Sequence, residues 1–133
     1  MYILHLVIPL EPRTKKNHLR IAGSGAKCKA CGRYLRQYIL QSRQHDEYKR
    51  AAMPYLAPRP EEPISFPVQV TYLFYMKTKR VVDKSNLTAA ADDMLVEAGI
   101  LEDDNSRILV SHDGTRVLYD KDNPRTEITI TAI

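Results

Sequence analysis

Apolar and polar residues alternate in three stretches of the chain, which is the pattern of β-strands with one buried face. These stretches cover residues 2–9 (YILHLVIP), 66–77 (FPVQVTYLFYMK) and 127–133 (EITITAI). The middle stretch carries no charge before its last residue and is rich in β-branched and aromatic residues. It is therefore expected to be the central strand, with one face made by Val68, Val70, Tyr72, Phe74 and Met76.

Two further segments have helical character. The first starts at Ser42, which is suited to cap a helix, and ends near Pro54. The second, residues 85–98, carries an apolar stripe, with Ser85 expected as its cap and Gly99 after its end. Short strands are expected at 107–111 and 115–119, around an Asp-Gly turn. The order of elements predicts an α+β fold, a single small domain with a mixed sheet and two main helices.

Length and composition limit the class of protein. With 133 residues, 44% of them hydrophobic, the chain fits one domain with one core. No apolar run approaches the roughly 18 residues that a membrane helix needs, so no membrane partner is expected. Residues 1–10 have neither the basic stretch nor the cleavage site of a secretory signal. A cytoplasmic protein with reduced thiols is the resulting expectation.

The charge is unevenly distributed along the chain. The net charge is +4, but residues 1–50 hold 11 Lys and Arg against three Asp and Glu, for +8, and the rest carries −4. Much of the basic charge lies in residues 11–29, which have little periodicity and are expected to form a long loop. This asymmetry is typical of a protein that binds a polyanion and needs carboxylates elsewhere. Two ordinary solvated faces are the alternative interpretation.

Charged residues flank the helix expected at 85–98 on both sides. The basic run 77–80 and Asp83 precede the helix, and Glu102, Asp103 and Asp104 follow it. Carboxylates at element ends beside cations suit a magnesium-dependent phosphodiesterase, because Mg²⁺ binds one or two carboxylates together with waters and phosphate. Neighbouring Lys and Arg would hold the phosphate backbone. Solvated loop corners are the simpler alternative.

The same region resembles the signature of RusA-type Holliday junction resolvases. The likeness is carried by residues 79–87 (KRVVDKSNL), 93–95 (DML), 98–99 (AG) and 103–104 (DD). The opening strand with the Pro, Lys and Arg residues up to position 17, and the last strand, are also similar to the family. The resemblance covers most of the chain apart from residues 22–36, which are expected to be a basic insertion.

The resemblance implies a homodimeric, Mg²⁺-dependent endonuclease that cleaves Holliday junctions and other branched DNA in recombination and repair. By position, it implies that Asp83 and Asp104 bind the metal and are catalytic, with Asp103 assisting them. The residues expected to contact DNA are Arg13, Lys15, Lys16, Lys79, Arg80 and Lys84.

Two positions depart from the family pattern. Ser85 stands where the family has a second Asp, and Ala89 stands where it has a functional Lys. One or two carboxylates can still hold Mg²⁺, and Lys84 or Lys79 can replace the missing cation. A catalytically impaired branched-DNA-binding protein of the same fold is therefore the alternative function.

The length of the helix constrains the site. A helix from 86 to 98 is about 20 Å long, so Asp104 meets Asp83 of the same chain only through a nearly extended return. Otherwise, Asp104 meets Asp83 of a second subunit, which suits the two-fold symmetry of a four-way junction. Asp93 is expected to be a structural or dimer-contact residue, and Asp92 a surface residue.

A separate motif lies in the insertion. Cys28 and Cys31 are spaced as in a zinc knuckle, but a structural Zn²⁺ site needs four ligands. His18, His45 or a second subunit would have to complete it. A reduced knuckle without metal and a disulfide are the alternatives. With zinc, the segment would be a basic DNA-facing finger, and a zinc-dependent nucleic-acid adaptor is a third functional hypothesis.

Overall fold

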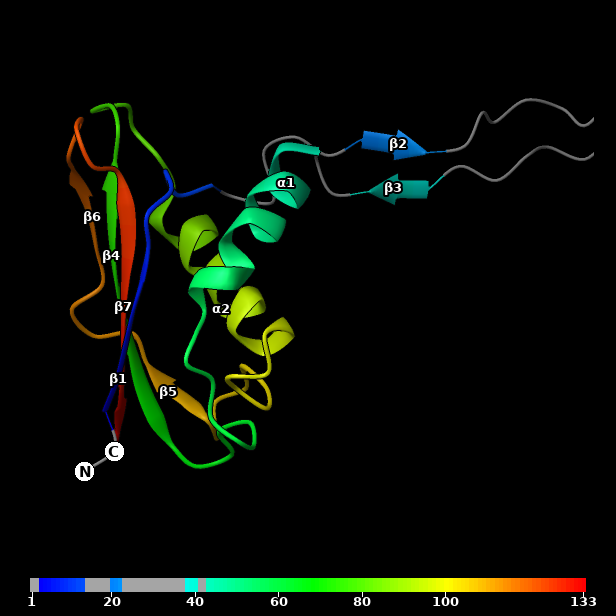
Figure 1. The fold of residues 1–133 in the computed structure, drawn as a ribbon, viewed down its shortest axis with the longest axis vertical. Helices are drawn as coiled ribbons and strands as arrows, with labels where there is room; N and C mark the ends of the chain where they lie inside the picture. Colours follow the sequence, from blue (N-terminus) through cyan, green and yellow to red (C-terminus); the bar gives the residue numbers. More distant parts are fainter. Residues whose placement is uncertain (1–2, 14–19, 23–37, 41–42) are drawn as a thin grey trace, which may run out of the picture.

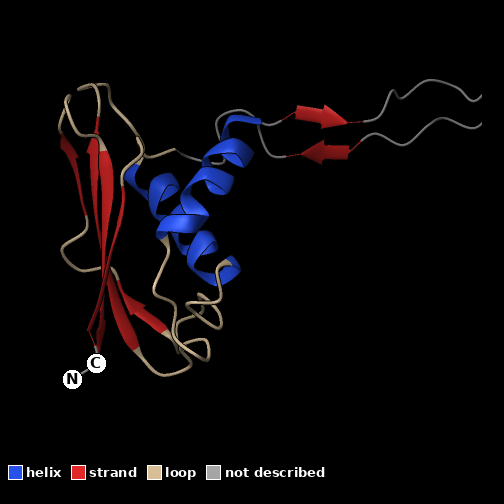
Figure 2. Cartoon of the chain, in the orientation of Figure 1, coloured by secondary structure: helices blue, strands red, loops and turns tan. Residues whose placement is uncertain are grey.

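A mixed sheet of five strands carries two helices on one of its faces (Figures 1 and 2). This architecture comes from a computed structural model, which describes residues 3–13, 20–22, 38–40 and 43–133. The predicted α+β class, with a small mixed sheet and two main helices in a single domain, is confirmed.

Strand β4 (Val68–Met76) lies in the middle of the sheet. It pairs antiparallel with β7 (Arg125–Ala132), which in turn pairs antiparallel with β1 (Ile3–Ile8). On its other edge, β4 pairs in parallel with two short strands, β5 (Leu109–Ser111) at its start and β6 (Arg116–Tyr119) at its end. The prediction that residues 66–77 form the central strand is therefore confirmed.

The core lies between the sheet and the helices. Every second residue of β4 from Val68 to Met76 is buried, as the alternation predicted. Leu6 and Ile8 of β1 and Ile128 and Ile130 of β7 extend the same buried face. The hydrophobic pattern determines the register, because a shift of one residue would turn these side chains toward solvent.

The helices are α1 (Arg43–Ala52), continued by a 3₁₀ turn (Met53–Tyr55), and α2 (Lys84–Glu97). The buried side chains of α2 include Leu87, Met94 and Leu95, part of the predicted apolar stripe. Gly99 ends the helix with φ +78°, a left-handed conformation that glycine adopts without steric cost. The predicted role of Gly99 as the residue after the helix is confirmed.

One local expectation was wrong. Residues 11–29 are not a continuous loop, because β2 (Arg20–Ala22) pairs antiparallel with β3 (Tyr38–Leu40). The two short strands expected around the Asp113–Gly114 turn are present as β5 and β6, and each pairs with a different part of the long β4 edge. Between them, Thr115 Oγ1 accepts a hydrogen bond from the Tyr72 backbone N–H at 3.2 Å. The turn thus occupies the gap between the two short strands.

Replacing Leu95 by Ala tests the packing of α2 on the sheet. Leu95 is fully buried, so we expect Leu95→Ala to lower the free energy of unfolding by about 2–5 kcal/mol. The matched control is Val81→Ala, which changes a side chain that is 94% exposed and should shift stability by less than about 0.5 kcal/mol. Urea unfolding followed by circular dichroism measures both changes, and equal midpoints for the two variants would contradict the packing.

Candidate active site

Asp83 is the N-cap of α2. Its Oδ1 accepts hydrogen bonds from the backbone N–H groups of Ser85 (2.9 Å) and Asn86 (3.3 Å). The prediction that Ser85 caps the helix is therefore wrong, since Ser85 lies within the first turn. Asp83 is exposed, and its Oδ2 accepts no hydrogen bond from the described residues. One carboxylate oxygen thus serves the helix, and the other faces solvent with capacity for a cation.

Exposed cations lie just before the start of α2 and at its first residue. They come from the segment that follows β4 and from the first helical residue, and they are Lys77, Lys79, Arg80 and Lys84. Lys79 Nζ lies 5.3 Å from the ring centroid of Tyr119, which pairs with Met76 at the end of β4. The predicted DNA contacts Lys79, Arg80 and Lys84 are therefore solvent-exposed near Asp83. A positive surface of this kind attracts phosphates.

Asp103 and Asp104 lie in the exposed loop that follows α2. Asp103 Oδ1 accepts a hydrogen bond from the Asp104 backbone N–H (2.8 Å), and its Oδ2 accepts one from Asn105 Nδ2 (3.1 Å). These bonds, the backbone bond most of all, hold the pKa of Asp103 below its usual value. Asp103 therefore organises the loop as an ionised carboxylate, and Asp104 is exposed beside it.

The two predicted metal ligands lie on either side of α2 in the chain. Asp83 precedes a helix of 14 residues, which is about 21 Å long at 1.5 Å per residue. Asp104 follows its far end, where Leu101 pairs with Ile64 before the chain enters β5. In the described part of the chain, no three His, Cys, Asp or Glu side chains are grouped to hold a metal ion. Asp83 and Asp104 are oxygen ligands of the type Mg²⁺ prefers, and a site using both takes them either from one chain, through a return of the loop along α2, or from two chains.

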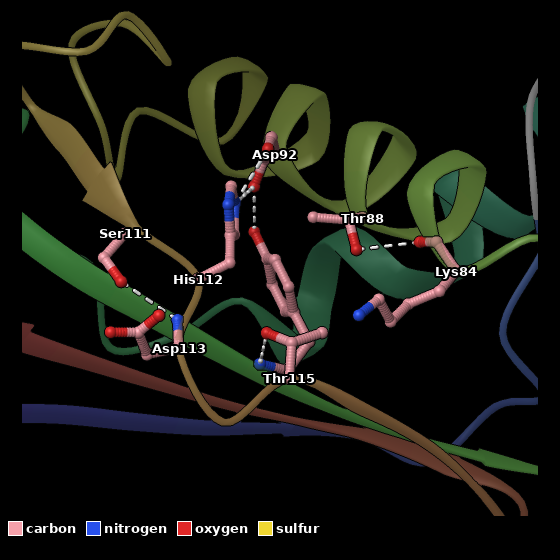
Figure 3. A network of polar contacts seen from close by, with 8 residues as sticks. Lys84, Thr88, Asp92, Ser111, His112, Asp113 and Thr115 are labelled. Atoms are coloured by element: carbon pink, nitrogen blue, oxygen red, sulfur yellow. Dashed lines mark hydrogen bonds and ion pairs between the residues drawn. The ribbon is translucent and has the colours of Figure 1, made fainter.

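Asp92 occupies a position that sequence reasoning missed. It was expected at the surface, but it is only 7% exposed and faces β4 and the β5–β6 turn (Figure 3). Tyr72 Oη donates to Asp92 Oδ1 at 2.6 Å. His112 Nε2 lies 3.0 Å from Oδ1 and 3.1 Å from Oδ2 of the same carboxylate. Partners from two other elements therefore satisfy this buried carboxylate, as burial requires.

The ring of His112 also contacts Tyr72 through its face. The two ring centroids are 5.8 Å apart, with planes 28° from parallel. Burial raises the pKa of Tyr72 well above its usual value, and the neighbouring charge of Asp92, the hydrogen bond to it and the charge of Asp104 raise it further. Tyr72 therefore remains a hydrogen-bond donor at neutral pH. The predicted burial of Tyr72 was the one available signal for this site, because a buried hydroxyl needs a partner.

The remaining predicted site residues fall mostly outside the described part of the chain. Arg13 is described and exposed, with its guanidinium 3.8 Å from a carboxylate oxygen of Glu11. Four other predicted site residues lie outside the described residues: Lys15, Lys16, Cys28 and Cys31. The same holds for nearly all of the expected insertion at 22–36. The predicted zinc site therefore stays a prediction.

Comparison with known proteins adds no family. No protein-family model matches the chain, and no curated protein matches it. Among the described helices, none is long and apolar enough to cross a membrane. Any function must therefore be argued from the residues, their geometry and the resemblance noted above.

The capping role of Asp83 can be separated from its charge. Asp83→Ala removes the acceptor for two backbone N–H groups, and we expect it to cost about 1 kcal/mol of stability. Asp83→Asn keeps an acceptor oxygen and should cost less than about 0.5 kcal/mol, because Asn caps helices as well as Asp does. Ser85→Ala is the control and should be near neutral. Chemical denaturation checks all three, and a larger loss for Ser85→Ala than for Asp83→Ala would contradict the assignment.

Proposed function

We propose that this chain is a RusA-type, Mg²⁺-dependent endonuclease that cleaves four-way junctions and other branched DNA in recombination and repair. The observation that carries the proposal is the surroundings of Asp83. Its carboxylate presents a free oxygen to solvent at the start of α2, and the exposed Lys79, Arg80 and Lys84 lie next to it in the chain. A carboxylate that can hold a cation, beside cations that can hold phosphate, is the combination that cleavage of a phosphodiester needs.

The proposed roles follow from the chemistry of each side chain. Bound Mg²⁺ would polarise the scissile phosphate and activate a water molecule. Lys79, Arg80 and Lys84 would contact the DNA backbone near the scissile bond, and Arg13 with its basic neighbours would contact it farther away. Asp103 would hold the loop that presents Asp104, since both of its oxygens accept hydrogen bonds within that loop.

The length of α2 supports a homodimer as the active form. Asp83 and Asp104 lie on either side of this 14-residue helix in the chain, so they meet within one subunit only if the loop after α2 returns along it. In the arrangement proposed here, the site instead takes Asp83 from one subunit and Asp104 from the other. Two such sites are related by a two-fold axis. A four-way junction has matching symmetry, so a dimer with two sites can cut two opposite strands.

A branched-DNA-binding protein without nuclease activity is the second candidate. Ser85 favours it, because this residue offers a hydroxyl where the related pattern has a carboxylate, and its N–H is used by the Asp83 cap. Asp83 then has a structural reason to be present even without a metal. In that case the basic surface would still bind junctions, but no strand would be cut.

Junction cleavage separates the two candidates. We expect the wild-type protein to cut a synthetic four-way junction with Mg²⁺ and not with EDTA. Asp83→Asn should keep junction affinity within about threefold and lower the cleavage rate by a factor on the order of 100 or more, since it removes the charge and keeps the cap. Gel assays of binding and cleavage measure both. Junction binding without any cleavage by the wild type would favour the second candidate.

Mixing two inactive variants tests the composite site. A dimer of one Asp83→Asn subunit and one Asp104→Asn subunit contains one intact site if the carboxylates meet across the dimer. We therefore expect cleavage to return after the two proteins are mixed and exchanged. Each homodimer alone is the control. If the carboxylates acted within one chain, every subunit would carry a defect and the mixture would stay inactive.

The salt dependence of binding tests the phosphate contacts. The double variant Lys79→Gln/Arg80→Gln should weaken junction binding and reduce the slope of log K against log salt by about 2, because each lost phosphate contact removes about 0.9. Lys49→Gln is the matched control, since Lys49 Nζ is already paired with Glu97 Oε1 at 3.1 Å. Fluorescence anisotropy at several salt concentrations measures the slopes, and equal slopes for both variants would remove Lys79 and Arg80 from the interface.

A further inference from the structure

Asp92 and His112 form a carboxylate–imidazole pair that the proposed metal chemistry does not use. Asp92 comes from the core-facing side of α2, and His112 comes from the turn between β5 and β6 (Figure 3). The carboxylate also accepts the Tyr72 hydroxyl from β4 at 2.6 Å. Three elements thus fix the position of one imidazole ring, which also lies against the ring of Tyr72.

The hydrogen bonds determine which nitrogen of His112 is available. The Tyr72 hydroxyl donates a hydrogen bond to Asp92, so the carboxylate accepts hydrogen bonds from both Tyr72 and His112. His112 must then carry hydrogen on Nε2, which leaves a lone pair on Nδ1 of the neutral ring. No described residue bonds to Nδ1, and the His112 side chain is one-third exposed, at 33%. The carboxylate therefore leaves a proton acceptor on a partly exposed ring, as the carboxylate does in hydrolases that use an Asp–His pair.

Groups suited to a phosphodiester lie near this pair. Lys84 and Thr88 precede Asp92 at intervals of four residues, and the three side chains project from the same side of α2 (Figure 3). The charge of Asp104 also contributes to the raised pKa of the Tyr72 hydroxyl in this network. Lys84 and Thr88 therefore lie on the side of α2 from which Asp92 meets His112 (Figure 3).

We propose that His112 is the catalytic base of the cleavage reaction and that Asp92 is its positioning residue. This inference rests on the proposed nuclease function. Nδ1 takes a proton from a water molecule as the water oxygen bonds to phosphorus. The bond between phosphorus and the departing sugar oxygen breaks, and that oxygen takes a proton from solvent. The ionisable groups that face His112 are Asp92 from α2 and Tyr72 from β4, with Asp113 next to it in its own turn.

The dependence of the cleavage rate on pH tests the role of His112. Because the base acts when neutral, the wild-type rate should rise with pH to a plateau. His112→Gln should lower the plateau by about 100-fold or more and remove this step. His5→Gln is the matched control, since His5 is exposed on β1 and bonds only to Thr129 among the described residues. It should leave the profile unchanged.

The tautomer of His112 provides a readout that does not depend on activity. Nitrogen-15 NMR of the wild type at alkaline pH should show hydrogen on Nε2 and a lone pair on Nδ1. Asp92→Asn should reverse this, because the amide that still accepts from Tyr72 presents its NH₂ to Nε2. The cleavage rate of Asp92→Asn should also fall, as that of His112→Gln does. Tyr72→Phe removes one hydrogen bond from Asp92 but keeps the pair, so it should reduce stability and lower cleavage by much less than His112→Gln does.

The outcomes separate the inference from the function on which it rests. Hydrogen on Nδ1 in the wild type overturns the role of His112 whatever the activity. Cleavage by His112→Gln at the wild-type rate across the pH range overturns it while leaving the nuclease function intact. A wild-type protein that cuts no junction contradicts the nuclease function and the catalytic role together. Finally, Tyr72→Phe and His112→Gln could lower the cleavage rate equally, each in proportion to its loss of stability. That result would show that the network has only a structural role.

Discussion

The position of α2 on the sheet depends on one buried carboxylate. Asp92 faces β4 from the helix, and burying a carboxylate is costly unless donors meet it. The Tyr72 hydroxyl and the His112 imidazole meet it from two different elements. The carboxylate of Asp92 therefore holds the helix, the central strand and the β5–β6 turn in fixed positions relative to one another. The apolar contacts of α2 supply most of the burial, and this polar contact selects one arrangement among the many that apolar contacts alone would allow.

Much of the fold could be predicted because its signals are local. Alternation located the long strands, and the apolar stripe with Gly99 located α2. The pairing of β5 and β6 could not be predicted from their closeness in the chain, because the nine-residue β4 offers each of them a separate place on its edge. The cap was missed for a related reason. Asp83 and Ser85 are both good caps, and the path of the chain after β4 decides between them.

The candidate site also has one part that the sequence could locate and one part that it could not. Resemblance to a known family located Asp83, Asp103 and Asp104, because their spacing along the chain is part of its pattern. The network of Tyr72, Asp92 and His112 has no such spacing, since its members are each 20 or more residues apart. Only the fold brings them together. Asp83 and Asp104 lie on either side of the 14-residue α2 in the chain, so their spacing in the sequence alone does not determine whether they meet.

The double use of Asp83 bears on how this position should vary among related chains. Its Oδ1 serves the helix, so selection for folding alone would retain Asp, Asn, Ser or Thr there after any loss of cleavage. An aspartate at this position is therefore weak evidence of an active enzyme. Exchange among those four residue types in a lineage would indicate that only the cap is under selection. Strict retention of Asp, with Asn excluded, would indicate that the negative charge itself is needed.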